Sequence, residues 1–103
     1  MSNWASMKVV REVLLERLRQ DEKFGEQNHR DGTGLWGDED AADAARAACD
    51  ENFRYGNGTW RDVLAEEFNE ALAESDPDKL RAELIQVAAV AVAWAEAIDR
   101  RRP

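Results

Sequence analysis

The stretch from Thr59 to Ile98 carries acidic residues at helical spacing within an otherwise apolar pattern. Glu67 and Glu70 lie three residues apart in its first half, and Glu83 and Gln86 lie three apart in its second half. Residues three or four apart share one face of a helix. The stretch therefore predicts two helices, joined by a tight turn, that each present a pair of oxygen-bearing side chains.

The acids of the first of these helices share a face with the apolar side chains Phe68 and Leu72. Carboxylates on an apolar face are costly to desolvate, and a bound cation is the usual way to offset that cost. Hard cations such as Mg²⁺ prefer several oxygen ligands in a fixed geometry. We therefore expect Glu67, Glu70 and Glu83 to converge on one metal site.

The plain alternative is a solvated acidic surface without a metal. In that case, the acids would form ordinary salt bridges with Arg61, Lys79 or Arg81, which lie on the same two helices. Both interpretations stay open at this point.

The spacing of the acids also resembles a known signature. Glu66-Glu67-x-x-Glu70, then twelve residues, then Glu83-x-x-Gln86 is similar to the EExxE…ExxD pattern of the MazG-like, all-α nucleoside triphosphate pyrophosphohydrolases. The segment of residues 16–29 resembles the amino-terminal part of small phage and actinobacterial MazG-like proteins. Together, the two resemblances cover most of the chain.

The resemblance implies an all-α fold, a four-helix MazG-like bundle completed by oligomerisation. It also implies hydrolysis of a nucleoside triphosphate to the monophosphate and pyrophosphate, with Mg²⁺, or else Mn²⁺, as cofactor. A cation at the glutamates would bridge phosphate oxygens and lower the pKa of a water. Glu66, one residue from the acidic face, would orient or deprotonate that water.

Gln86 departs from the signature, because the last acid of the pattern is normally Asp. Its amide oxygen can ligate Mg²⁺ but carries no charge, so the affinity should fall. Three explanations stay open. The site holds fewer ions than its relatives, the polar loop supplies an acid such as Asp31, or catalysis has been lost and the protein only binds nucleotide.

The substrate-binding residues are expected near the amino-terminal segment and the following loop. Arg17 and Lys23 would meet phosphates, while Gln20 and Asn28 would meet base or sugar edges. An aromatic side chain can stack on a base. The candidates for stacking are Phe24 and Trp36.

Length and charge limit the remaining possibilities. With 103 residues, the chain is expected to form one domain, residues 1–103. The net charge of −8 argues against nucleic acid as a partner. A single cysteine, Cys49, excludes an intrachain disulfide and favours a reducing cytoplasm. No signal peptide is evident, and the longest apolar run, Val87 to Ala95, is too short for a membrane span of roughly 20 residues.

Periodicity and capping signals predict four helices, near residues 3–22, 39–55, 60–75 and 77–100. Asp38 is expected to cap the second helix and Thr59 the third, while Pro77 should open the fourth. A glycine-rich polar loop is expected from Gly25 to Gly37. One apolar stripe is expected on each of the first two helices, and the stripe on the second helix should face inward. The two stripes are Met7, Val10, Val13, Leu14 and Leu18, and Ala42, Ala45, Cys49 and Phe53.

The fourth helix is apolar nearly all round between Leu84 and Ile98. A helix of that kind is buried on every side, and three short neighbours would not cover it. We therefore expect a homo-oligomer with this helix in the interface, and the resemblance implies a homodimer or a dimer of dimers.

Two further classes of function stay open. One is a non-catalytic helical oligomer that binds nucleotide or a protein partner, which Gln86 favours. The other is an acidic decoy that mimics nucleic acid, which the net charge favours. A decoy would spread its acids over the surface, whereas a metal site requires them to converge.

Overall fold

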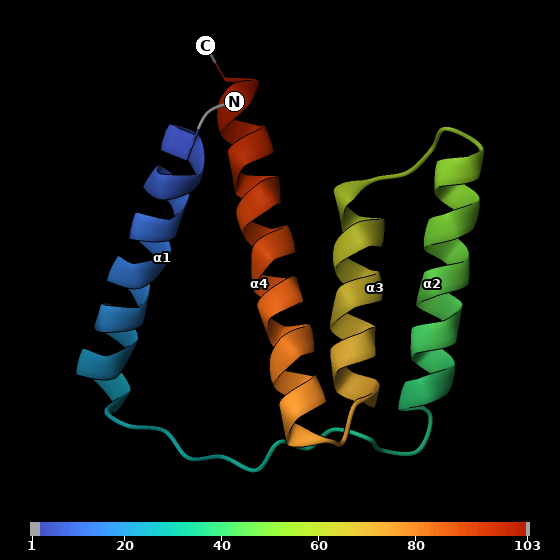
Figure 1. Ribbon diagram of the computed structural model, residues 1–103, viewed down its shortest axis with the longest axis horizontal. Helices are drawn as coiled ribbons and strands as arrows, with labels where there is room; N and C mark the ends of the chain where they lie inside the picture. Colours follow the sequence, from blue (N-terminus) through green and yellow to red (C-terminus); the bar gives the residue numbers. More distant parts are fainter. Residues whose placement is uncertain (1–2, 103) are drawn as a thin grey trace. The chain divides into compact units, whose positions relative to one another are not determined.

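Four α-helices are present in a computed structural model that describes residues 3–102, with side chains from residue 7 onward (Figure 1). They are α1 (Asn3–Phe24), α2 (Asp38–Arg54), α3 (Trp60–Ala73) and α4 (Pro77–Arg100). The described residues contain no strand. The predicted all-α class is confirmed, and every helix end lies within two residues of its predicted position.

Local hydrogen bonds explain where α2 ends and α3 begins. The amides of Gly56 and Asn57 donate to the carbonyls of Phe53 and Asn52, which is the Schellman arrangement that closes a helix. Thr59 is the N-cap of α3, as predicted, and it forms a capping box with Asp62. The predicted N-cap of α3 is confirmed.

The start of α4 also follows the prediction. Pro77 is the first helical residue, a position where its missing amide hydrogen is not needed. Asp76 precedes it, and its side chain accepts a hydrogen bond of 3.0 Å from the Lys79 amide. The short connection after α3 therefore restarts a helix at once.

The predicted cap of α2 was wrong by one residue. Gly37 occupies the N-cap position, and Asp38 is already helical. The φ of +90° at Gly37 is a conformation that favours glycine, and it lets the chain close a tight turn over residues 35–38. Asp38 stabilises that turn, since its Oδ2 accepts a hydrogen bond of 2.8 Å from the Leu35 amide.

The chain comprises two compact units, and α4 contributes to both. Unit 1 contains Met1–Asp31 and Val92–Pro103, and unit 2 contains Gly32–Ala91. The first part of α4 thus belongs to unit 2 and its last part to unit 1. The single domain over residues 1–103 stays a prediction.

In unit 2, α2 packs against α3, and α3 lies between α2 and the first part of α4 (Figure 1). Its buried apolar residues are small or medium in size, namely Ala42, Cys49, Ala71 and Leu80. Small side chains allow helices to approach closely. Phe53, which was predicted to face inward on α2, is instead half-exposed, and its ring lies over Gly58 in the turn that follows.

In unit 1, α1 lies beside the last part of α4, and Val9 is buried there. The apolar stripe predicted on α1 exists but faces outward, because Val10, Leu14 and Leu18 are 44–64% exposed. The predicted stripe is therefore present on α1, and its apolar side chains lie at the surface of the chain. Val9 lies next to Val10 on a different face of the helix.

The loop from Gly25 to Gly37 is confirmed as non-helical, and its second half is anchored within unit 2. The Gly34 amide donates a hydrogen bond of 2.8 Å to the Leu72 carbonyl at the end of α3. Gly34 has a φ of +72°, and an added Cβ would lie 2.9 Å from the Ser75 side chain. Glycine is therefore required at this contact, which holds the start of α2 next to the end of α3.

The surface of α4 remains largely apolar within unit 2. Leu84 and Ile85 are each more than half exposed. One chain therefore leaves part of this helix uncovered, as the sequence suggested. In the described part of the chain, no helix combines the length and apolar character that a membrane span requires.

Candidate metal centre

Three glutamates from two helices come together in unit 2. Glu67 and Glu70 lie on α3 and Glu83 lies on α4, and each offers one carboxylate oxygen within 4.8 Å of the others. All three residues are half-buried. We call Glu67, Glu70 and Glu83 the glutamate cluster, and its convergence agrees with the prediction from their spacing.

Two oxygens of the glutamate cluster have no hydrogen-bond partner among the described residues. They are Oε2 of Glu67 and Oε2 of Glu83, and both atoms are buried. A buried carboxylate oxygen without a partner carries a large desolvation cost. The donor set of three carboxylates fits a hard divalent cation, which would supply the missing positive charge.

The electrostatics of the glutamate cluster also favour a bound cation. Burial raises the pKa of Glu67 above its ordinary value, and the neighbouring charges of Glu70, Glu83 and Glu66 raise it further. Both effects disfavour the charged carboxylate. A cation at this point would act in the opposite direction.

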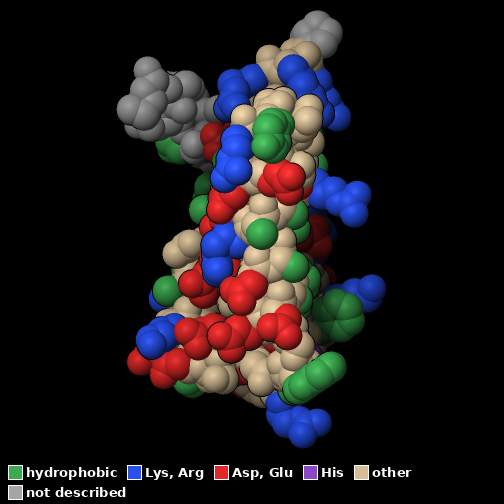
Figure 2. Space-filling model, turned by 90° about the vertical axis from the view of Figure 1, so that its right-hand side faces the viewer, with side chains coloured by type: hydrophobic (Ala, Val, Ile, Leu, Met, Phe, Trp, Pro, Cys, Tyr) green, Lys and Arg blue, Asp and Glu red, His purple; other side chains and the backbone are tan. Residues whose placement is uncertain are grey.

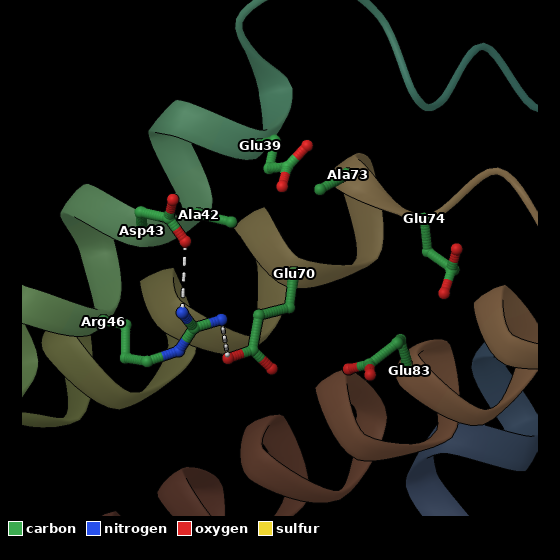
Figure 3. Close-up of a pocket in the computed structure, with 8 residues that line it drawn as sticks. All are labelled: Glu39, Ala42, Asp43, Arg46, Glu70, Ala73, Glu74 and Glu83. Atoms are coloured by element: carbon green, nitrogen blue, oxygen red, sulfur yellow. Dashed lines mark hydrogen bonds and ion pairs between the residues drawn. The ribbon is translucent and has the colours of Figure 1, made fainter.

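Glu70 is the member of the cluster that has a counter-ion. The guanidinium of Arg46 on α2 lies 3.3 Å from Glu70 Oε1 and 3.2 Å from Asp43 Oδ1 (Figure 3). Its hydrogen bond with Glu70 is the main reason that the pKa of Arg46 is raised. Among the described residues, the cluster is thus paired by Arg46 rather than by Arg61, Lys79 or Arg81, the partners named in the plain alternative.

Arg46 could not be predicted as a partner of the cluster from the sequence, because Glu70 lies 24 residues away in the chain. The only signal in the sequence is its position three residues after Asp43, which by itself indicates an ordinary pair on a helix surface.

The glutamate cluster borders a hollow between α2, α3 and α4. Its volume is about 490 Å³. Glu39, Asp43 and Arg46 enter it from α2, whereas Glu70 and Glu83 face it from the opposite side (Figure 3). The remaining lining residues are Ala42, Ala73 and Glu74. The hollow is open, polar and strongly acidic, with Arg46 as the cation among its described lining residues.

Acidic side chains also gather outside this hollow. Figure 2 shows the α2 side of unit 2, where a band of acids crosses the surface. The first turn of α2 contributes Asp38, Glu39 and Asp40. An acidic surface of this kind would repel the phosphates of a nucleic acid. The absence of a nucleic-acid partner stays a prediction from the charge.

Glu66, the predicted catalytic residue, lies on α3 next to the cluster but is not one of its three converging members. Its pKa is raised by burial first, then by the charges of Glu70 and Asp50, while Arg46 opposes these effects. The charge of Glu66 in turn contributes to the raised pKa of the buried Cys49 thiol on α2, after burial itself. Glu66 is therefore close enough to α2 for its charge to influence Cys49 and Arg46.

Gln86 lies one turn beyond Glu83 on α4 and is exposed. It does not belong to the described lining of the hollow, so its role as a metal ligand stays a prediction. Asp31, the alternative acid from the loop, is also exposed.

Most predicted substrate-binding residues belong to unit 1, where each interacts with a residue near it in the sequence. Arg17 donates 2.9 Å hydrogen bonds to Gln20 and Asp21. The Lys23 ammonium lies 5.1 Å from the centre of the Phe24 ring, and Asn28 donates a hydrogen bond of 2.8 Å to Glu26. Arg17, Lys23, Phe24 and Asn28 are exposed, whereas Gln20 is half-buried. Their contacts with a substrate stay predictions.

Trp36 belongs to unit 2 and is fully exposed. It lies in the turn over residues 35–38, where the Asp38 amide donates a hydrogen bond of 3.0 Å to the Leu35 carbonyl. A well-held turn thus presents an indole ring to solvent, and its stacking on a base stays a prediction. It does not line the hollow beside the cluster.

Comparisons with protein-family models, curated proteins and solved structures found no match to this chain.

Proposed function

We propose that this chain binds a divalent cation at the glutamate cluster and hydrolyses nucleoside triphosphates to the monophosphate and pyrophosphate. The observation that carries the proposal is the pair of buried, unpartnered oxygens on Glu67 and Glu83. Both residues converge with Glu70 in the glutamate cluster, and Glu70 and Glu83 line a hollow that is open enough for phosphates. A solvated acidic surface would leave these oxygens in water, and a nucleic-acid decoy would not require them to converge.

The proposed reaction is a displacement at the α-phosphorus. Mg²⁺ or Mn²⁺ would supply charge neutralisation of the phosphates and a lower pKa for the attacking water. Glu66 accepts the proton of that water, which the raised pKa of its carboxyl favours. A bond forms between the water oxygen and the α-phosphorus, the bond to the bridging oxygen breaks, and pyrophosphate leaves.

The proposed substrate contacts follow the sequence prediction. Arg17 and Lys23 bind phosphates, Gln20 and Asn28 bind base or sugar edges, and Phe24 or Trp36 stacks on the base. The full exposure of Trp36 supports the last of these roles.

The proposed assembly is a MazG-like bundle completed by a second copy, as a homodimer or a dimer of dimers. The exposed Leu84 and Ile85 on α4 support an interface there, and the outward stripe on α1 supplies further apolar surface. Large contiguous apolar patches typically mark interaction sites. The free, buried Cys49 thiol is compatible with the proposed location in a reducing cytoplasm.

A screen of the nucleoside triphosphates with Mg²⁺ or Mn²⁺, with pyrophosphate as readout, tests the activity. Isothermal titration of both cations into the metal-free protein tests the site separately. We expect binding and pyrophosphate release that are both lost on chelation. Absence of cation binding in the wild-type protein would refute the metal site and the enzyme proposal together.

The uncharged, exposed Gln86 favours one second candidate function. In that case, the protein is a non-catalytic helical oligomer that binds a nucleotide or a protein partner, having lost full metal binding. Nucleotide binding without pyrophosphate release, for every nucleotide and both cations, would select this candidate.

A further inference from the structure

Arg46 is a basic side chain that faces the acidic hollow from α2. Its two terminal nitrogens are divided between Asp43 on its own helix and Glu70 on α3 (Figure 3). Its side chain remains 49% exposed, so the guanidinium is held by its partners but is still open to solvent. A group in this position is available to a ligand that enters the hollow.

Glu70 can contact Arg46 and a cation with different oxygens. Oε1 lies next to Arg46, while the other oxygen lies on the side of Glu83 (Figure 3). A carboxylate has about four lone-pair sites on its two oxygens. Arg46 therefore neutralises part of the cluster without covering the unpartnered oxygens of Glu67 and Glu83.

The negative charge of the proposed substrate requires positive groups in the site, which the acidic residues do not provide. A polyphosphate carries several negative charges, and a single divalent cation cancels two of them. The hollow adds the carboxylates of Glu39, Asp43 and Glu74, which repel the remaining phosphate oxygens. Arg46 is the positive group among the described residues that line this hollow.

We infer that Arg46 is a phosphate-binding residue of this site, an inference that rests on the proposed function. Binding of a cation by the cluster reduces the pull of Glu70 on the guanidinium. The planar fork of Arg46 then binds two oxygens of one phosphate, a geometry that suits arginine better than lysine. Arg46 is thus a counter-ion of the empty cluster and a ligand of the polyphosphate in the loaded one.

The test measures binding rather than turnover. Mg²⁺ alone, and then inorganic tripolyphosphate in the presence of Mg²⁺, are titrated into the wild-type protein and into Arg46→Gln. We expect the variant to bind Mg²⁺ as well as or more tightly than the wild type, because a repelling charge is gone. Its affinity for tripolyphosphate should fall roughly 10- to 100-fold, the effect of a lost hydrogen bond to a charged group.

Two further variants control the measurement. Arg54→Gln removes the same charge from an exposed position in the last turn of α2 and should bind both ligands as the wild type does. Arg46→Lys keeps the charge but loses the fork, and its tripolyphosphate affinity should lie between those of the wild type and Arg46→Gln. It also serves as the test if the neutral variant does not fold.

The outcomes separate the inference from the proposed function. Failure of the wild-type protein to bind Mg²⁺ refutes the proposed function and this inference with it. Normal Mg²⁺ and tripolyphosphate binding by Arg46→Gln refutes the inference alone. Loss of Mg²⁺ binding in Arg46→Gln also overturns it, because Arg46 would then act by orienting Glu70.

Discussion

At the scale of single residues, Glu70 can contact both the Arg46 guanidinium and a cation bound at the glutamate cluster. One of its oxygens contacts the Arg46 guanidinium, and it also belongs to the three converging carboxylates. Glu67 and Glu83 each keep a buried oxygen without a partner. Removing the charge of Glu70 should therefore weaken both the metal site and the ion pair with Arg46 on α2.

Glu70→Gln should abolish cation binding and any hydrolysis, because it removes one of three charged ligands. The loss of cation affinity should exceed the roughly 10- to 100-fold effect of losing an outer partner of a ligand. The fold should remain intact or become slightly more stable, since one of several repelling carboxylates is gone. Isothermal titration of Mg²⁺ and thermal unfolding of the metal-free variant check both parts.

The matched control is Glu51→Gln, which removes an equal charge from an exposed position on α2. It should bind cations as the wild type does. Unchanged cation binding and activity in Glu70→Gln would mean that the acids form a solvated surface.

Gln86 offers a second test, because an aspartate there would restore the signature that this chain resembles. If the exposed Gln86 side chain reaches the ions, Gln86→Asp adds a charge and should tighten Mg²⁺ binding and raise turnover. If Gln86 instead donates a hydrogen bond to substrate, the same change should weaken function. Titration of Mg²⁺ and a pyrophosphate assay on both forms distinguish these results. We expect the first, and an unchanged variant would place Gln86 outside the site.

At the scale of elements, the capping box determines where α3 begins and hence which of its residues face α4. Thr59 Oγ1 accepts a hydrogen bond of 3.3 Å from the Asp62 amide and donates one of 2.8 Å to Asp62 Oδ2. Thr59→Ala should lower the free energy of unfolding by about 0.5–2 kcal/mol. Chemical denaturation measures this loss, and Thr59→Ser, which keeps the hydroxyl, should retain most of the stability. Equal stability of all three proteins would contradict the role of the cap.

The same box predicts how stability depends on pH. Hydrogen bonds from the side chains of Thr59 and Asn52 lower the pKa of Asp62 below its ordinary value of 3.8. The unfolded chain therefore binds more protons between the two pKa values, and stability rises with pH in that window. The contribution of Asp62 is complete above pH 3.8 and is lost as the pH falls through the folded-state pKa.

Asp62→Asn should remove this contribution. Denaturation of both proteins from neutral pH down to pH 3 should show the variant less stable at neutral pH, with the difference shrinking in acid. A difference that stays constant with pH would show that the charge of Asp62 does not stabilise the fold.

At the scale of the whole molecule, the apolar surface that one chain leaves uncovered predicts self-association. Ile85 is 57% exposed on α4, where a second copy is expected to dock. Ile85→Glu should shift the protein toward the 11.7 kDa monomer, because a buried unpaired charge is costly. Sedimentation at micromolar concentration measures the shift.

Ala47→Glu is the control for this change, since it introduces the same charge at an exposed position of α2. It should sediment as the wild type does. A wild-type protein that is a stable, well-folded monomer at micromolar concentration would contradict the predicted oligomer.

The elements of this protein could be predicted from the sequence because their causes are local. The capping box spans Thr59 to Asp62, Pro77 opens α4 at once, and helical spacing places Glu67 and Glu70 on one face. Each depends on residues within one turn of each other, so the pattern is visible without a fold. The expected convergence of Glu83 with these two acids also agreed with the structure, since a short turn joins the two helices.

Contacts between helices were decided by the tertiary structure. The pairing of Arg46 with Glu70 joins residues 24 positions apart, and no local spacing encodes it. The outward direction of the stripe with Leu14 and Leu18 likewise depends on which face of α1 meets α4. An apolar stripe indicates that a face can be buried, whereas the packing of the chain determines whether it is. The sequence therefore predicted the acids of the site, and the fold added the arginine beside them.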